Sequence, residues 1–93
     1  MRTIERSSAF KRDYKRESKG QHRVTLDADL VPVVTVLADD GALDAKYRDH
    51  DLGGDWKGYR ECHIKPDLLL IYKKPDKDTL QLARIGLHSE LFG

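Results

Sequence analysis

The 93-residue sequence has a single cysteine and no long apolar run. One cysteine cannot close an internal disulfide, so the fold does not depend on an oxidising compartment, and we expect a cytoplasmic protein. No stretch approaches the roughly 20 apolar residues of a membrane span, and the N-terminus lacks the apolar segment of a signal peptide. These absences predict a protein that has no membrane partner.

Metal and phosphate signatures are also missing. The histidine spacings match no compact ligand pattern such as HExxH or CxxC, and no glycine-rich phosphate loop occurs. We therefore expect no metal and no other cofactor. A metal site built from His50, His63 and His88 with Asp67 or Cys62 remains as an alternative.

The composition, with 39% apolar and 35% charged residues, is typical of a soluble globular protein with one domain spanning residues 1–93. The net charge is only +1, but it is unevenly distributed. Residues 1–25 carry eight Lys or Arg and three acids, whereas residues 26–55 carry two Lys or Arg and eight Asp. A basic end beside an acidic middle predicts a surface that can meet phosphate groups on one side. Two oppositely charged helix faces without such a partner would explain the same counts.

The N-terminal segment predicts a strand followed by a helix. Residues 3–6 alternate in polarity and are interpreted as a short strand. Ser7 or Ser8 can cap the helix by accepting a hydrogen bond from its first turn. Phe10 and Tyr14, four residues apart, mark the buried side of this helix.

A second helix is predicted from residue 21 to residue 38. Pro32 lies inside it, and because proline lacks an amide hydrogen, we expect a kink there or two helical pieces. The β-branched run of residues 33–36 makes a buried strand the alternative, but Asp39-Asp40-Gly41 is a natural helix stop. The predicted apolar stripe of this helix comprises Val24, Leu26, Leu30, Val33, Val34 and Leu37.

The C-terminal half predicts three strands, after a long connection over residues 39–58 that we expect to dock on the fold. The strands are predicted at residues 59–65, 68–74 and 79–86, joined by two proline-containing turns. The fold class is therefore α+β. A short N-terminal strand and two helices pack on a C-terminal antiparallel β-meander, in the order β-α-α-β-β-β.

Alternation along these strands predicts which side chains share a face. Cys62 points to one face of the first strand, and Glu61 and His63 point to the other. Arg84 is predicted to share a face with Leu82, and also with His88 if the last strand continues that far.

Five polar residues could be gathered by this meander: His50, His63, Asp67, Arg84 and His88. Such a set suits RNA cleavage by attack of a 2′-OH on the neighbouring phosphate. That reaction needs a base for the hydroxyl proton, an acid for the leaving oxygen and positive charge on the phosphate. Histidine can serve as base or acid near neutral pH, and the guanidinium of arginine matches phosphate oxygens.

Three motifs in the C-terminal half carry a family resemblance. They are D-H-x-L-x-G-x-W-K-G-Y-R at residues 49–60, H-x-x-P-D-x-x-L-I-Y at 63–72 and R-x-G-x-H-x-x-L-F-G at 84–93. In this order and spacing they resemble the YafQ branch of the RelE/ParE toxin superfamily. The resemblance implies a toxin of a type II toxin–antitoxin pair that enters the ribosomal A site and cuts mRNA there without a metal.

The resemblance also implies roles for residues and partners. It places His50, His63, Asp67 and His88 in catalysis with Arg84 beside them, and Phe92 and Lys65 at the substrate. It further implies a cognate antitoxin, expected to be of the ribbon-helix-helix type, and operator DNA bound only through the toxin–antitoxin complex. Contacts with ribosomal RNA are expected from the N-terminal basic residues Lys11, Arg12, Lys15, Arg16, Lys19 and Arg23.

One departure from the family concerns the residue after the Pro-Asp pair, where relatives often carry Trp and this chain has Leu68. If that Trp stacks on a codon base, its loss removes on the order of 1–3 kcal/mol and changes codon preference. The ParE branch, which inhibits DNA gyrase by binding and without catalysis, supplies the alternative function on the same scaffold.

Overall fold

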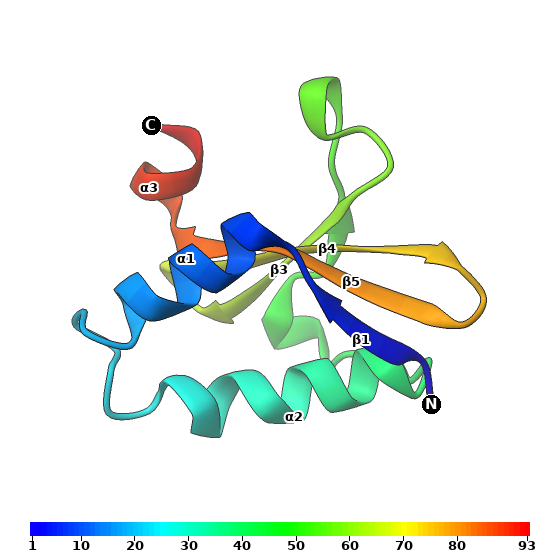
Figure 1. The fold of residues 1–93 in the computed structure, drawn as a ribbon, viewed down its shortest axis with the longest axis horizontal. Helices are drawn as coiled ribbons and strands as arrows, with labels where there is room; N and C mark the ends of the chain where they lie inside the picture. The colour runs from blue at the N-terminus through cyan, green and yellow to red at the C-terminus, as the bar shows by residue number, and fades with distance from the viewer.

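A five-stranded sheet in the order β1-β5-β4-β3-β2 forms the centre of the computed structural model, which describes all 93 residues (Figure 1). Its three long strands form the predicted antiparallel meander, and β1 adds to β5 in parallel. The α+β prediction is therefore confirmed. The elements are β1 (Thr3–Arg6), α1 (Ser8–Glu17), α2 (Leu26–Ala38), η1 (Ala45–Tyr47), β2 (His50–Asp51), η2 (Gly54–Trp56), β3 (Arg60–Lys65), β4 (Leu68–Asp76), β5 (Thr79–Leu87) and α3 (His88–Phe92).

The first helix begins as its cap predicts. The Oγ atom of Ser7 accepts a hydrogen bond from the amide of Phe10 at 2.9 Å, which satisfies one of the free donors of the first turn. The same hydroxyl donates to the carbonyl of Ala83 in β5 at 2.7 Å. One serine thus both starts α1 and fastens it to the sheet.

The second helix differs from the prediction at its start. It begins at Leu26 and not at residue 21; residues 21–25 form turns, and Val24, expected in the buried stripe, is 88% exposed. Thr25 makes no side-chain capping bond. The helix continues through Pro32 as one piece. Pro32 lies on the exposed side, where water can bond the carbonyl that proline leaves free.

The core lies between α2, α1 and one face of the sheet. In β4, Leu68, Leu70 and Tyr72 belong to this core, as does Cys62 of β3. Leu69 and Ile71 are fully buried too, but alternation turns them to the opposite face of the sheet. Burial on both faces explains why this strand is a continuous apolar run. No helix is long and apolar enough to span a membrane.

Side chains of α1 cover the edge of β5 beyond the end of β1. The amide of Ser7 donates to the carbonyl of Leu82, and the carboxylate of Asp13 accepts from the amide of Ile85 at 3.2 Å. Arg16 donates to the carbonyl of Ile85 at 3.3 Å. These contacts take the place of a paired strand for the Leu82 carbonyl and for the amide and carbonyl of Ile85.

Candidate functional site

His50 and His63 meet over one carboxylate on the sheet face that lies away from the helix-packed core. In the sheet register His50 of β2 pairs with Glu61 of β3, and His63 follows Glu61 by two residues on the same face. The Nε2 atoms of both rings lie 3.6 Å from Oε1 of Glu61, and the ring centroids are 6.5 Å apart. Glu61 is only 6% exposed. Two imidazoles therefore share one buried carboxylate.

Backbone carbonyls set the tautomer of both rings. Nδ1 of His50 lies 2.7 Å from the carbonyl of Arg48, and Nδ1 of His63 lies 3.2 Å from the carbonyl of Pro66. Because a carbonyl only accepts, each Nδ1 carries the hydrogen. Each Nε2 is therefore the atom left to take or give a proton.

Arg48 holds an unusual backbone conformation directly before this pair. Its φ of 52° and ψ of 41° are left-handed, a region that non-glycine residues enter only at some cost. This conformation belongs to the turn in which the Arg48 carbonyl meets His50. The local strain is thus coupled to the placement of a candidate functional histidine.

Glu61 is the main site residue that the sequence motifs did not single out. Alternation already placed Glu61 and His63 on one face of β3. What the sequence could not supply was the pairing of β3 with the two-residue strand β2, which brings His50 opposite Glu61.

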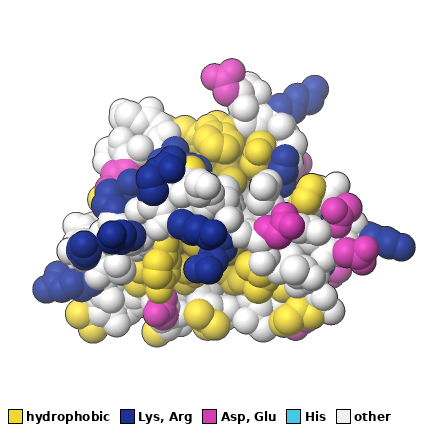
Figure 2. Space-filling view, in the orientation of Figure 1, with side chains coloured by type: hydrophobic (Ala, Val, Ile, Leu, Met, Phe, Trp, Pro, Cys, Tyr) yellow, Lys and Arg dark blue, Asp and Glu magenta, His cyan; other side chains and the backbone are white.

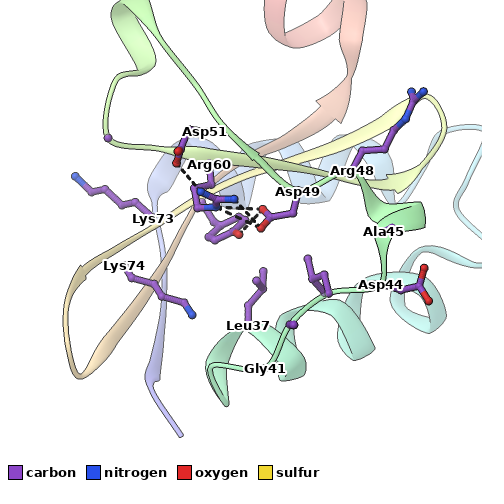
Figure 3. Close-up of a pocket in the computed structure, with 14 residues that line it drawn as sticks. Leu37, Gly41, Asp44, Ala45, Arg48, Asp49, Asp51, Arg60, Lys73 and Lys74 are labelled. Carbon is purple, nitrogen blue, oxygen red and sulfur yellow. Dashed lines mark hydrogen bonds and ion pairs between the residues drawn. The ribbon is translucent and has the colours of Figure 1, made fainter.

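An ion-paired cluster anchors the long connection that carries His50 (Figure 3). The Tyr72 hydroxyl donates to Asp49 at 2.6 Å, and the Arg60 guanidinium donates to Asp49 at 3.0 Å and to Asp51 at 2.5 Å. Burial, with the bond to Asp49, raises the pKa of Tyr72, and Asp49 also raises the pKa of Arg60. The cluster lines a cavity of about 640 Å³ and fixes the residue next to His50. The predicted docking of this connection is confirmed for its first part, where Leu43 and Tyr47 pack on the core, whereas residues 52–58 extend away from the sheet (Figure 1).

Asp67 lies at the turn between β3 and β4, and both of its carboxylate oxygens are engaged. His22 donates to Oδ1 at 2.9 Å, and Gln21 donates to Oδ2 at 2.8 Å. Both partners come from the turns between α1 and α2. Asp67 thus joins this segment to the turn whose Pro66 carbonyl holds His63. His22 is a further residue that the sequence motifs left out.

Arg84 lies on the site face, but not on the face of Leu82, so that part of the prediction was wrong. In the register Tyr72 pairs with Leu82 and the preceding Ile71 pairs with Arg84, which leaves Ala83 as an extra residue. A bulge of this kind reverses the alternation that follows it. Arg84 therefore shares the face of Ile71 and, through the pairing with β3, of Glu61.

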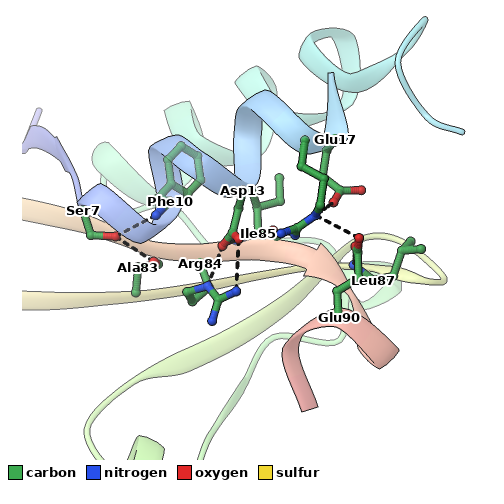
Figure 4. Close-up of polar contacts among 10 residues, drawn as sticks. Ser7, Phe10, Asp13, Glu17, Ala83, Arg84, Ile85, Leu87 and Glu90 are labelled. Atoms are coloured by element: carbon green, nitrogen blue, oxygen red, sulfur yellow. Dashed lines mark hydrogen bonds and ion pairs between the residues drawn. The ribbon is translucent and has the colours of Figure 1, made fainter. Parts of the chain in front are cut away.

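A buried carboxylate holds the Arg84 guanidinium (Figure 4). Nε and Nη2 of Arg84 donate to the two oxygens of Asp13 at 2.5 and 3.0 Å, and Asp13 is 2% exposed. This bond raises the pKa of Arg84, which stays positively charged. Since a guanidinium has five N–H groups, three remain available to a ligand.

Arg16 is held in ion pairs within the protein and is not a free surface cation, contrary to its predicted role. Its guanidinium lies 3.0 Å from Asp13, 2.8 Å from Glu17 and 2.8 Å from Glu90. Burial raises the pKa of Glu17. Since Glu90 belongs to α3, these pairs fasten the C-terminal helix to α1.

The helix α3 carries the other two predicted site residues. Because β5 ends at Leu87, His88 does not continue the strand and its predicted placement on the strand face of Arg84 was wrong. His88 and Phe92 lie one turn apart with ring centroids 5.3 Å from each other, and Phe92 is 40% exposed. The exposed ring of Phe92 is free to contact a ligand and does not fill the core.

The remaining predicted cations divide into two groups. Lys65 pairs with Asp29, and this bond lowers the pKa of Asp29. On α1 and after it the basic residues are exposed and make no ion pair, and Figure 2 shows Lys and Arg side chains gathered over this region. This second group comprises Lys11, Arg12, Lys15, Lys19 and Arg23, the last of which donates to the carbonyl of Gly20.

The structure brings together no three ligand-type side chains at a point that a metal ion could occupy. Cys62 lies fully buried on the helix-side face of β3, opposite to His63, so the alternative of a shared metal site with Cys62 is wrong. Burial raises the pKa of its thiol to about 12. Leu68, which stands where relatives often carry Trp, is also fully buried.

Comparisons with known proteins match the whole chain. Residues 2–93 match the family of the bacterial toxin YafQ of type II toxin–antitoxin systems. The mRNA interferase toxin YafQ of Escherichia coli strain K12 is 41% identical over 93 residues, covering 99% of this chain and 97% of the relative. The structure of YafQ from Escherichia coli strain BL21(DE3) superposes with a TM-score of 0.85 at 38% identity, covering both chains completely.

Two further structures show relatives with partners. In the Escherichia coli DinJ–YafQ toxin–antitoxin complex, the toxin superposes with a TM-score of 0.83 at 40% identity, covering 99% of this chain and 98% of that one. A metal-bound toxin from Helicobacter pylori superposes with a TM-score of 0.81 at 45% identity, covering 99% of this chain and 100% of that one. The sequence match over residues 2–93 and the shared fold agree: the chain belongs to the YafQ family of bacterial toxins of type II toxin–antitoxin systems.

Proposed function

We propose that this protein is an mRNA interferase that enters the ribosomal A site in the cytoplasm and cleaves the mRNA there. The observation that carries the proposal is the His50–Glu61–His63 arrangement, in which the Nε2 atoms of two imidazoles lie beside a shared carboxylate. The relative at 41% identity is named an mRNA interferase, which agrees with this chemistry.

The reaction moves two protons and uses no metal. A base removes the proton of a 2′-OH, the 2′-oxygen attacks the adjacent phosphorus, and the bond to the 5′-oxygen breaks. An acid protonates that leaving oxygen, so the products carry a 2′,3′-cyclic phosphate and a 5′-OH. His50, His63 and His88 share this acid–base work, and Asp67 serves either as a base or as the group that orients an imidazole.

Arg84 and Phe92 supply binding to the same substrate. Arg84, with three N–H groups left after its bonds to Asp13, stabilises the charge that develops on the phosphate. The exposed ring of Phe92 stacks on a base of the mRNA, which is worth about 1–3 kcal/mol. Lys65 lies beside the mRNA strand. The exposed cations of α1 face ribosomal RNA, where each contact releases counterions.

A cognate antitoxin is the second proposed partner. The Escherichia coli relative forms a complex with DinJ, and we expect a comparable antitoxin of the ribbon-helix-helix type for this chain. Operator DNA would then be bound through the toxin–antitoxin complex.

Primer extension on a defined mRNA tests the enzymatic proposal. Purified protein with programmed ribosomes is expected to produce discrete cuts within the A-site codon, and their sequence gives the codon preference. The control is naked mRNA, where cuts would indicate an ordinary nuclease. No cuts with growth still arrested would favour a gyrase-binding toxin.

Variants of His22 test whether cleavage requires the contact that holds Asp67 in place. Replacing His22 by alanine removes one of the two donors to Asp67, and a misplacement of this kind is expected to slow cleavage about tenfold. His22→Gln retains a donor near the same position and should cleave like the wild type. The measurement is the single-turnover rate on programmed ribosomes from about pH 5.5 to 8.5. Equal rates for all three proteins would show that the contact is only structural.

A further inference from the structure

A cleft of about 570 Å³ opens beside His63, between η1 and the turn that joins β3 to β4. Lys46, Arg48 and Lys65 contribute its cations, and Asp29 contributes its one carboxylate. Clefts of this volume are in the range that holds small ligands. Its lining is therefore predominantly basic.

Two of these positive charges are not compensated by the protein. Lys65 and Asp29 neutralise each other in their ion pair. Arg48 makes no side-chain hydrogen bond or ion pair, and Lys46 approaches only the ring of Tyr47, at 5.2 Å from its centroid. Lys46 and Arg48 are both exposed. The cleft therefore offers two free cations to an anionic ligand.

The cleft continues directly into the candidate functional site. His63 lines it, and the carbonyl of Arg48 holds Nδ1 of His50. Figure 3 shows the Arg48 side chain extending away from the cluster of Asp49 and Arg60, so it is not tied to that anchor. An RNA strand that reaches His50 and His63 through this cleft would pass Lys46 and Arg48.

We propose that this cleft binds the sugar–phosphate backbone of the RNA next to the scissile phosphate, with Lys46 and Arg48 each neutralising one phosphate. The assignment deepens the proposed function and rests on it for the identity of the strand. Single-stranded RNA fits because its phosphates are evenly spaced anions, and because the half-buried ring of Tyr47 beside Lys46 can contact a sugar or a base.

Salt-dependent RNA binding by the free protein tests the assignment without ribosomes. The probe is a fluorescent RNA hexanucleotide with 2′-O-methyl groups, which cannot attack the phosphate. For single strands, log K falls with log salt by about 0.7 for each neutralised phosphate. The Lys46→Gln/Arg48→Gln variant is therefore expected to lower this slope by about 1.4 and to weaken binding at low salt.

Two matched variants isolate the effect of position. Lys57→Gln/Lys77→Gln removes the same charge from exposed sites outside the cleft and should leave the slope unchanged. Lys46→Arg/Arg48→Lys keeps both charges and should keep the slope. The melting temperature of every variant is measured, and all substituted side chains are exposed, so folding is expected to persist.

Cleavage on programmed ribosomes supplies a second readout. The Lys46→Gln/Arg48→Gln variant is expected to raise KM with kcat near the wild-type value, because the lost contacts bind substrate and transition state alike. A changed salt slope without any cleavage by the wild-type protein would support the cleft and contradict the proposed function. If the Lys46→Gln/Arg48→Gln variant has the same salt slope as the Lys57→Gln/Lys77→Gln control, the proposal that the cleft binds RNA is wrong. An unchanged slope with weakened antitoxin binding would assign it to an acidic protein segment instead.

Discussion

Replacement of Asp13 by alanine is expected to destabilise the protein by about 3 kcal/mol, the lower end of the range for breaking a buried ion pair. The carboxylate is 2% exposed and accepts hydrogen bonds from Arg84, Arg16 and the amide of Ile85. Its loss leaves the Arg84 guanidinium without its partner and the Ile85 amide without an acceptor, and Arg16 keeps only Glu17 and Glu90. The lower end applies because both arginine side chains stay partly exposed, at 26% and 41%.

Urea denaturation and thermal melting measure this effect. For a chain of this size, 3 kcal/mol corresponds to a fall in melting temperature of more than about 10 °C. Asp13→Asn keeps the shape and one acceptor and should lose less. Asp55→Ala, at an exposed carboxylate without an ion pair, is expected to change stability by less than about 0.5 kcal/mol. Equal stability of the Asp13→Ala and Asp55→Ala proteins would contradict the role of Asp13.

Alanine at His50, His63 or His88 is expected to abolish growth inhibition, each substitution acting alone. A positioned acid or base contributes about 10²–10⁴-fold to such a reaction, and a toxin that slow would leave most mRNA intact. The three side chains lie outside the helix-side core, so the melting temperature should stay near the wild-type value. Growth after induction, cleavage on programmed ribosomes and thermal melting are measured for each variant.

Glu61→Gln separates the positioning of the histidines from their proton transfer. Glutamine keeps the size of the side chain between the two rings but removes its charge, so the pH profile of cleavage should change while the fold is retained. A triple histidine variant that is fully toxic and melts normally would contradict the acid–base assignment. An unchanged pH profile in Glu61→Gln would restrict Glu61 to a packing role.

Local chemistry in the sequence was sufficient for most of the elements. Ser7, one of the two predicted caps, starts α1, because a capping bond depends only on residues three positions apart. The apolar run of β4 and the turns on either side of it defined the meander for the same local reason. The start of α2 was misjudged because Val24 continues the helical spacing, yet no capping contact or core neighbour extends the helix to it.

Site residues whose placement depends on distant partners were harder to predict. An alternation argument put Arg84 on the wrong face because a bulge at Ala83 depends on how β5 pairs with β4. Arg16 looked like one more surface cation until α3 brought Glu90 beside it. Asp67 is held by His22 and Gln21, which precede it by 45 and 46 positions in the chain. No local sequence pattern encodes a pairing over that distance.

The sequence by itself determined the α+β class, the order of the first two helices and the four main strands, the family resemblance and the candidate histidines, because these follow from short motifs and periodicity. It did not predict β2 or α3. Only the tertiary structure decided that Glu61 lies between His50 and His63 and that Asp13 holds Arg84. It also decided which cations remain free around the site. The reason is physical, since strand register and ion pairing between distant segments depend on how the whole chain packs.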